Sequence, residues 1–183
     1  MRSYSFEGII LKRINIGEAD KLITFFTKEK GKITLKVRGL RKISSKRAGS
    51  LELFNLVKAS AVKGRGTIDT LTEVQVLAHH GDWKNFLGKI NLAYQLCEVI
   101  DKILPEEEAH PQVFRQLSDY LSQISYLKND WESQMRIWLI SLLVELGYWP
   151  QQKEFTGDIN QYIENIVQRP INSPRILNKL RSR

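Results

Sequence analysis

The spacing of hydrophobic and polar positions changes once along the chain, near residue 80. Before that point it follows the short period of β-strands, in five segments separated by glycine-containing or polar turns. In the third segment, basic and polar side chains alternate with Ile, Leu and Val, so one face of that strand is expected to be largely basic. The predicted strands are Ser5–Ile16, Lys21–Thr27, Lys32–Val37, Leu53–Val62 and Thr67–Leu77.

The connections between these strands carry glycine and positive charge. Hairpin turns are predicted at Glu29–Lys32 and at Gly64-Arg65-Gly66. The longer connection Arg38–Ser50 has no apolar periodicity, which predicts a flexible loop. Five short strands with such turns are typical of a small closed β-barrel of the OB type.

After residue 80 the apolar positions recur every three or four residues, as in helices. A helix capped by Asp82 is expected to end at Pro105, and Gly147 is expected to end a helix that is apolar nearly all round, which predicts the buried centre of a bundle. We therefore predict an α+β, two-domain chain, with an OB-fold barrel in residues 1–79 and an all-α domain in residues 80–183. The further predicted helices are Gln112–Tyr126, Trp131–Leu146, Asp158–Val167 and Ser173–Leu180.

The positive charge belongs to the predicted barrel. Residues 1–80 carry 16 Lys and Arg against 7 Asp and Glu, a net charge of +9, whereas residues 81–183 carry 12 against 13. Clustered cations release counterions from a phosphate backbone, which favours a nucleic-acid partner, although a basic surface can also serve solubility alone. The candidate DNA-binding residues are Lys12, Arg13, Lys32, Lys36, Arg38, Arg41, Lys42, Lys46, Arg47, Lys63 and Arg65.

Aromatic candidates for base stacking are fewer than the cations. Phe6, Phe25, Phe26 and Phe54 all lie in or beside predicted strands, where a core position is the favoured interpretation. The pattern therefore indicates an electrostatic, sequence-tolerant contact with nucleic acid and not base readout.

Catalytic and metal-binding patterns are not found in the sequence. Cys97 lies among apolar residues and is expected to be an inert core thiol, and His79-His80 is expected at a surface junction without further ligands. Glu106–Glu108 fits the start of a helix or a solvated linker better than an acid–base pair, and no phosphate-binding glycine loop is present. We therefore expect a binding protein without enzymatic activity, cofactor or metal.

No membrane association is expected either. The longest apolar run, Ile137–Val144, is far shorter than the ~20 residues that cross a bilayer. The first residues lack the pattern of a signal peptide, so the predicted location is cytoplasmic.

An ordered series of segments covers the predicted barrel within the first 78 residues, and the fourth of them includes a basic loop that runs into the next strand. The segments are Glu7–Leu11, Gly17–Thr27, Gly31–Ile33, Arg38–Phe54 and Thr70–Glu73. This series resembles the RecO family of DNA-repair proteins. Leu146–Pro150 is similar to the family's leucine-glycine-tyrosine-x-proline turn.

The resemblance implies a role in recombinational repair. Such proteins bind single- and double-stranded DNA, anneal complementary strands and load recombinase together with RecR, which contacts the N-terminal domain. The helical domain of some members holds the tail of the single-strand-binding protein. Many members also carry a four-cysteine zinc module, whereas this chain has no cysteine after Cys97, so we expect a short form without zinc, associated with the nucleoid.

Other functions remain open on the residues alone. An RNA-binding OB-fold accessory protein would have the same charge and the same barrel. An enzyme acting on nucleic acid would need a residue set that is not apparent, and the helical half could serve mainly as a scaffold for a protein partner.

Overall fold

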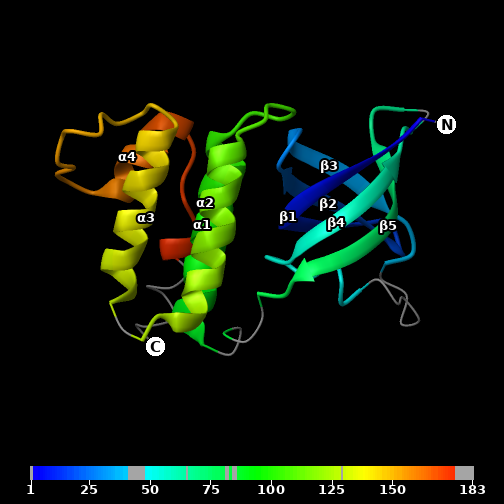
Figure 1. The fold of residues 1–183 in the computed structure, drawn as a ribbon, viewed down its shortest axis with the longest axis horizontal. Helices are drawn as coiled ribbons and strands as arrows, with labels where there is room; N and C mark the ends of the chain where they lie inside the picture. The colour runs from blue at the N-terminus through cyan, green and yellow to red at the C-terminus, as the bar shows by residue number, and fades with distance from the viewer. Residues whose placement is uncertain are drawn as a thin grey trace. The chain divides into compact units, whose positions relative to one another are not determined.

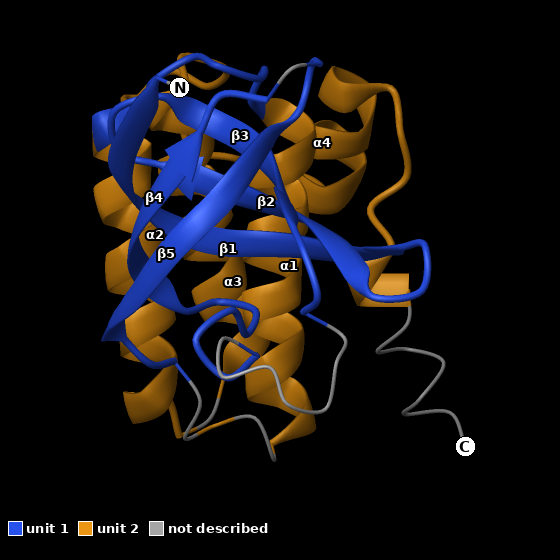
Figure 2. Ribbon diagram, turned by 90° about the vertical axis from the view of Figure 1, so that its right-hand side faces the viewer, with its two compact units in different colours: residues 1–81, 104–111 blue, residues 82–103, 112–183 orange. Residues whose placement is uncertain are grey.

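The computed structural model describes residues 2–40, 48–64, 66–80, 83, 86–128 and 130–175. The chain divides into two compact units, shown in different colours in Figure 2. The first unit contains Met1–Gly81 and Leu104–Pro111, and the second contains Asp82–Ile103 and Gln112–Arg183. The sequence pattern predicts a single boundary after residue 79, whereas in the structure the segment after the first helix packs with the strands.

The first unit is a closed five-stranded barrel, and the predicted OB fold is confirmed (Figure 1). The strands close in the order β1-β2-β3-β5-β4, with β3 and β5 parallel and the other neighbours antiparallel. The strand bounds are β1 Ser3–Ile16, β2 Asp20–Thr27, β3 Gly31–Val37, β4 Leu56–Val62 and β5 Asp69–Ala78.

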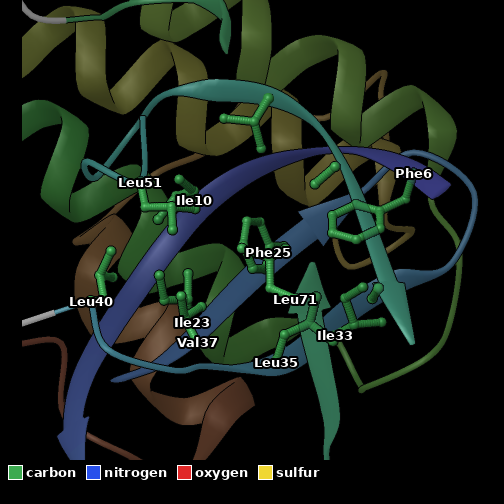
Figure 3. Packing of buried hydrophobic residues seen from close by; sticks show 13 residues of the cluster. Phe6, Ile10, Ile23, Phe25, Ile33, Leu35, Val37, Leu40, Leu51 and Leu71 are labelled. Carbon is green, nitrogen blue, oxygen red and sulfur yellow. The ribbon is translucent and has the colours of Figure 1, made fainter. Parts of the chain in front are cut away.

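The barrel core follows from alternation along the strands. Along β3, the apolar side chains of Ile33, Leu35 and Val37 enter the core, so the intervening polar side chains point outward. Figure 3 shows how these residues pack with residues of the other strands inside the barrel. The rings of Phe6 and Phe25 meet edge to face, with 5.3 Å between their centroids.

The fourth strand starts later than the sequence predicts. It begins at Leu56 and not at Leu53, because Phe54 has a left-handed φ of 73° that interrupts an extended strand. The turn is tied to β1 instead, since the Phe54 N–H donates to the Ile10 carbonyl at 2.9 Å.

The seam between β3 and β5 is short, and another part of the chain lies along it. Only Leu35 and Lys36 of β3 pair with β5. At the start of β3, Lys32 forms a parallel bridge with Glu106, in the segment Leu104–Pro111 that we call the acidic connector. Its three glutamates are exposed, as a linker predicts, but the backbone pairing with β3 was not predicted.

The second unit is helical, as predicted. Its helices are α1 Leu87–Ile103, α2 Pro111–Gln123, η1 Ile124–Tyr126, α3 Trp131–Glu145 and α4 Ile159–Val167. The start of α1 differs from the prediction: it begins at Leu87, and Asp82, the predicted cap, lies outside the described residues. Most of the predicted helix Ser173–Leu180 also lies outside them.

Helix α3 is buried on one side only. Trp138 and Leu142 form part of its buried stripe, and the Trp138 ring stacks on Tyr120 of α2 at 4.9 Å. Ile137 on the other side is 58% exposed, so the prediction of a helix buried all round is wrong. One residue in a helix turns by about 100°, which places Ile137 away from that stripe. The predicted stop at Gly147 is confirmed, with the Tyr148 N–H donating to the Leu143 carbonyl at 2.8 Å.

Cys97 is buried, and burial raises the pKa of its thiol, which confirms the prediction of an inert core thiol.

None of the described helices is both long enough and apolar enough to cross a membrane.

Glu98 holds the segment after α4 against α1. Its carboxylate accepts hydrogen bonds from the N–H groups of Asn172 (2.9 Å) and Ser173 (2.8 Å) and from Lys102 Nζ (2.6 Å). Burial would raise the pKa of Glu98, but these donors outweigh it and hold the pKa below the ordinary value. The charged form therefore stabilises the helical unit.

We expect Glu98→Gln to lower the stability at pH 7 by about 1–3 kcal/mol, because buried donors lose a charged acceptor. Because the folded-state pKa is depressed, this contribution is present above the unfolded value of 4.5 and is lost as the pH falls through the folded pKa. Thermal unfolding between pH 7 and pH 3 should show the variant and the wild type converging below about pH 4.5. The matched control is Glu145→Gln at the exposed end of α3, where no change is expected. A difference that persists unchanged at low pH would contradict this role.

Candidate nucleic-acid interface

The outward side of β1, β2 and β3 carries two lysines and two threonines beside two apolar side chains. Its residues lie opposite one another in the strand register: Lys12 faces Thr24, Thr24 faces Thr34, and Leu22 faces Lys36. The hydroxyls of Thr24 and Thr34 are 3.0 Å apart. We call this surface the β1–β3 face, and its members are Lys12, Ile14, Leu22, Thr24, Thr34 and Lys36.

Asp20 orders one end of the β1–β3 face. Its two carboxylate oxygens accept from the Gly39 N–H at 2.9 Å and from Lys36 Nζ at 3.0 Å. These two contacts, the Gly39 N–H first, lower the pKa of Asp20. Asp20 therefore positions both Lys36 and the turn after Arg38, from which the chain enters the basic segment 41–47. Sequence reasoning missed this role, since nothing local marks the carboxylate as a partner of β3.

Two of the predicted DNA-binding cations, Arg13 and Lys32, have little exposed surface. Arg13 donates to the Leu51 carbonyl at 3.1 Å and to Glu52 at 2.9 Å, which ties β1 to the chain that precedes β4. Lys32 is only 7% exposed. Both therefore offer little surface to a phosphate, whereas Lys12, Arg38 and Lys63 are exposed. Arg41, Lys42, Lys46, Arg47 and Arg65 lie outside the described residues.

A groove of about 630 Å³ opens beside the β3–β5 seam, and we call it the Tyr4 groove. Lys30 Nζ lies 4.9 Å and Lys63 Nζ 5.6 Å from the centre of the Tyr4 ring, so the ring sits among cations. All of the groove belongs to the barrel unit. Its lining residues are Tyr4, Glu29, Lys30, Lys32, Ile33, Thr34, Leu35, Lys63, Thr67, Ile68, Asp69, Glu106 and Glu107.

Asp69 fixes the wall of the Tyr4 groove. Its carboxylate accepts from the Tyr4 hydroxyl at 2.8 Å, Lys63 Nζ at 3.0 Å and the Gly64 N–H at 3.1 Å. Burial would raise the pKa of Asp69, but these contacts outweigh it and lower the pKa. Burial first, and then Asp69, raise the pKa of Tyr4, so its hydroxyl stays protonated as a donor. The β4–β5 turn, Lys63 and Tyr4 are thus held as one network.

The aromatic predictions are confirmed for the phenylalanines. Phe6, Phe25, Phe26 and Phe54 are all 3% exposed or less, which excludes them as stacking platforms in this conformation. Tyr4, which the sequence reasoning did not single out, is partly exposed. The position of Tyr4 at the start of a predicted strand could have indicated this. A ring at that position can cover the end of the barrel while the edge of the ring remains accessible.

The histidine pair differs from the prediction of a surface junction. His79 is exposed, but His80 is 6% exposed, and burial lowers its pKa. Among the described residues, no three His, Cys, Asp or Glu side chains are grouped so that they could hold a metal ion.

Comparison with known protein families covers both units. Residues 1–80 match the family model described as "Recombination protein O N terminal", and residues 87–154 match "Recombination protein O C terminal". The chain belongs to the RecO family. The resemblance seen in the sequence is thereby confirmed. The β1–β3 face lies in the part that matches the N-terminal RecO model, and so does the Tyr4 groove except for Glu106 and Glu107, which fall in the C-terminal match.

Individual RecO relatives are similar over most of this chain. A DNA repair protein RecO from Symbiobacterium thermophilum is 29% identical over 157 residues, which cover 86% of this chain and 62% of the relative. Another from Dehalococcoides mccartyi is 31% identical over 153 residues, covering 82% of this chain and 59% of the relative. The chain thus spans about three fifths of the length of these RecO relatives.

The helical unit, most of which falls in the RecO C-terminal match, contains a second cavity of about 270 Å³. It lies between α1, α3 and α4, where Gly88 lets the Trp131 ring approach: a Cβ at Gly88 would lie 3.3 Å from that ring. Arg136 on its wall donates to the carbonyls of Phe155 (2.7 Å) and Gly157 (2.8 Å). Apolar and polar groups therefore meet in a cavity that could accept one or two side chains of a peptide.

Proposed function

We propose that this protein is a DNA-binding recombination mediator in DNA repair. It binds single- and double-stranded DNA, anneals complementary strands and, with RecR, helps to load recombinase in the cytoplasm, at the nucleoid. The observation that carries the proposal is an OB barrel in the RecO family whose outward β1–β3 face presents exposed or half-exposed cations, Lys12 and Lys36. Arg38 and the basic segment 41–47 follow directly after β3.

Charge neutralisation gives a physical basis for annealing. Two DNA strands repel each other through their phosphates, and cations that displace counterions from both backbones lower that repulsion. No bond has to be made or broken, so a binding surface suffices. One of the hydroxyls of Thr24 and Thr34 donates to the other, and the remaining hydroxyl proton can be donated to a phosphate oxygen without reading the bases.

Protein partners are assigned to different units in this proposal. RecR would contact the barrel unit, as the family resemblance implies. The tail of the single-strand-binding protein would occupy the cavity between α1, α3 and α4, which is lined by apolar side chains such as Leu92 and Met135 and by polar ones such as Arg136 and Asn160. That combination suits the end of a peptide chain.

A salt titration of the full chain tests the proposal. Fluorescence anisotropy with a labelled single-stranded oligonucleotide should give log affinity falling linearly with log salt concentration. If six phosphates are neutralised, the slope should be roughly −4. A response that is flat in salt would sink the proposal.

Competition distinguishes the proposed function from RNA binding. An unlabelled RNA of the same sequence should compete no better than DNA, because an electrostatic surface does not recognise the 2′-hydroxyl. Complementary strands should anneal faster with the protein than without it. Strong preference for RNA together with no annealing would favour an RNA-binding accessory protein instead.

A further inference from the structure

The Tyr4 groove already contains negatively charged groups of the chain itself. Glu106 and Glu107 of the acidic connector line it together with Lys30 and Lys63. The connector is held there by its backbone: the Glu107 N–H donates to the Lys32 carbonyl at 3.0 Å, beside the bridge between Lys32 and Glu106. These backbone contacts therefore fix the positions of Glu106 and Glu107 at the groove.

Close backbone contact fixes the connector further. A Cβ added at Gly31 would lie 2.0 Å from the Glu108 carbonyl oxygen, so β3 and the connector touch. Glu107 has a left-handed φ of 58°, which a residue other than glycine rarely adopts. Such a conformation persists only where surrounding contacts hold it.

The connector decides the sign of the groove's net charge. Among the described lining residues, three are cationic, and four are acidic, two of them from the connector. One of the other acids, Asp69, is engaged by Lys63 and Tyr4. The charge of Glu107 is felt at Tyr4 on the groove wall, since it adds, after burial and Asp69, to the raised pKa of Tyr4. Without the two connector carboxylates, the cations would outnumber the acids.

We propose that the Tyr4 groove binds the phosphates of one unpaired DNA strand, and that the carboxylates of Glu106 and Glu107 are its built-in competitor. This inference rests on the proposed function and adds a regulated site to it. The groove has the volume of a pocket for one small ligand, which admits a nucleotide of a single strand and not a duplex. The Tyr4 ring, with Lys30 and Lys63 over it, forms part of the wall that the strand would contact.

The carboxylates of Glu106 and Glu107 lower the affinity of the groove for single-stranded DNA, and annealing requires that a bound strand can be released. A strand that enters brings its phosphates beside the two carboxylates that line the groove together with Lys30 and Lys63, so it is held less tightly and is released more readily. Once two strands have paired, the duplex no longer fits the groove, and the same repulsion opposes its return. The connector thereby favours release of the annealed product.

The test is the double variant Glu106→Gln/Glu107→Gln in the full chain. Its affinity for a single-stranded oligonucleotide should rise roughly tenfold at about 0.1 M salt, the size expected for removing two like charges beside the bound phosphates. The slope of log affinity against log salt should steepen by up to roughly 1.4, about 0.7 for each of Lys30 and Lys63 that then contacts a phosphate. Affinity for duplex DNA should change much less.

Matched variants make the result specific to the groove. Glu108→Gln removes the same charge from the next residue, whose carboxylate lies 3.3 Å from His110 and does not line the groove. It should leave the affinity near that of wild type, whereas Glu107→Gln alone should raise it. Adding Lys30→Ala and Lys63→Ala to the double variant should abolish the gain.

The outcomes separate this inference from the proposed function. If the wild type binds single strands with a steep salt slope but Glu107→Gln and Glu108→Gln behave alike, the inference is wrong and the function stands. An equal gain for duplex DNA would also overturn it, because the effect would then be general charge and not competition in the groove. If the wild type binds no DNA, the proposed function fails first.

Discussion

Replacing the basic residues before and within segment 41–47 by alanine is expected to weaken single-strand binding roughly 100-fold at about 0.1 M salt. Each cation that contacts a phosphate contributes about 0.7 to the salt slope, so the slope should fall by roughly 2 to 3.5. Anisotropy titrations at several salt concentrations measure both, and strand annealing should slow in parallel. The substituted residues are Arg38, Arg41, Lys42, Lys46 and Arg47.

A matched pair of smaller variants shows whether the position of the charge matters. Arg41→Ala/Lys42→Ala removes one arginine and one lysine after β3, and Lys128→Ala/Arg169→Ala removes the same two residue types from exposed positions of the helical unit. Only the first pair should weaken binding strongly. If both double variants lose the same affinity for DNA, net charge alone attracts the DNA. If the five-residue variant anneals strands as fast as the wild type, the binding surface lies elsewhere.

Gly31→Ala is expected to destabilise the barrel unit by about 3 kcal/mol or more. Two costs combine: the φ of 67° is unfavourable for alanine, and the new Cβ would overlap the Glu108 backbone at 2.0 Å. The connector must then shift or β3 must distort. Urea unfolding measures the loss, and hydrogen exchange at the Glu107 amide, which is bonded to the Lys32 carbonyl, should speed up.

Gly17→Ala is the control for backbone strain without the close contact. Its φ is 53°, but no atom lies within 4 Å of the added Cβ. We expect a loss of about 1 kcal/mol, from the left-handed conformation alone. If the two variants lose the same stability and exchange at Glu107 is unchanged, the contact between β3 and the connector is too soft to position Glu106 and Glu107.

The two predictions address different parts of the same binding reaction. The basic segment after β3 is proposed to supply most of the attraction, and Asp20 holds Gly39 in the turn that precedes it in the chain. The acidic connector is proposed to reduce the attraction of DNA at the Tyr4 groove, and the absence of a side chain at Gly31 allows the connector to approach β3 closely. A protein that must both hold and release a strand needs each of these contributions.

The sequence by itself determined the elements and the family. Alternation along Lys32–Val37 predicts which side chains of β3 enter the core, and the helical period predicts α2, α3 and α4 to within a few residues. These patterns are visible in the sequence because a strand or helix repeats its exposure every two or three to four residues, which is a local property. The same ordered residues carried the RecO resemblance.

Only the tertiary structure decided which cations are available. Arg13 and Lys32 read as binding residues in the sequence, yet one is engaged by Glu52 and the other is buried. The pairing of Lys32 with Glu106 and the network of Tyr4 with Asp69 join residues far apart in the chain. Such contacts depend on how the barrel closes and where the chain returns to it, and no periodicity within a short segment records that.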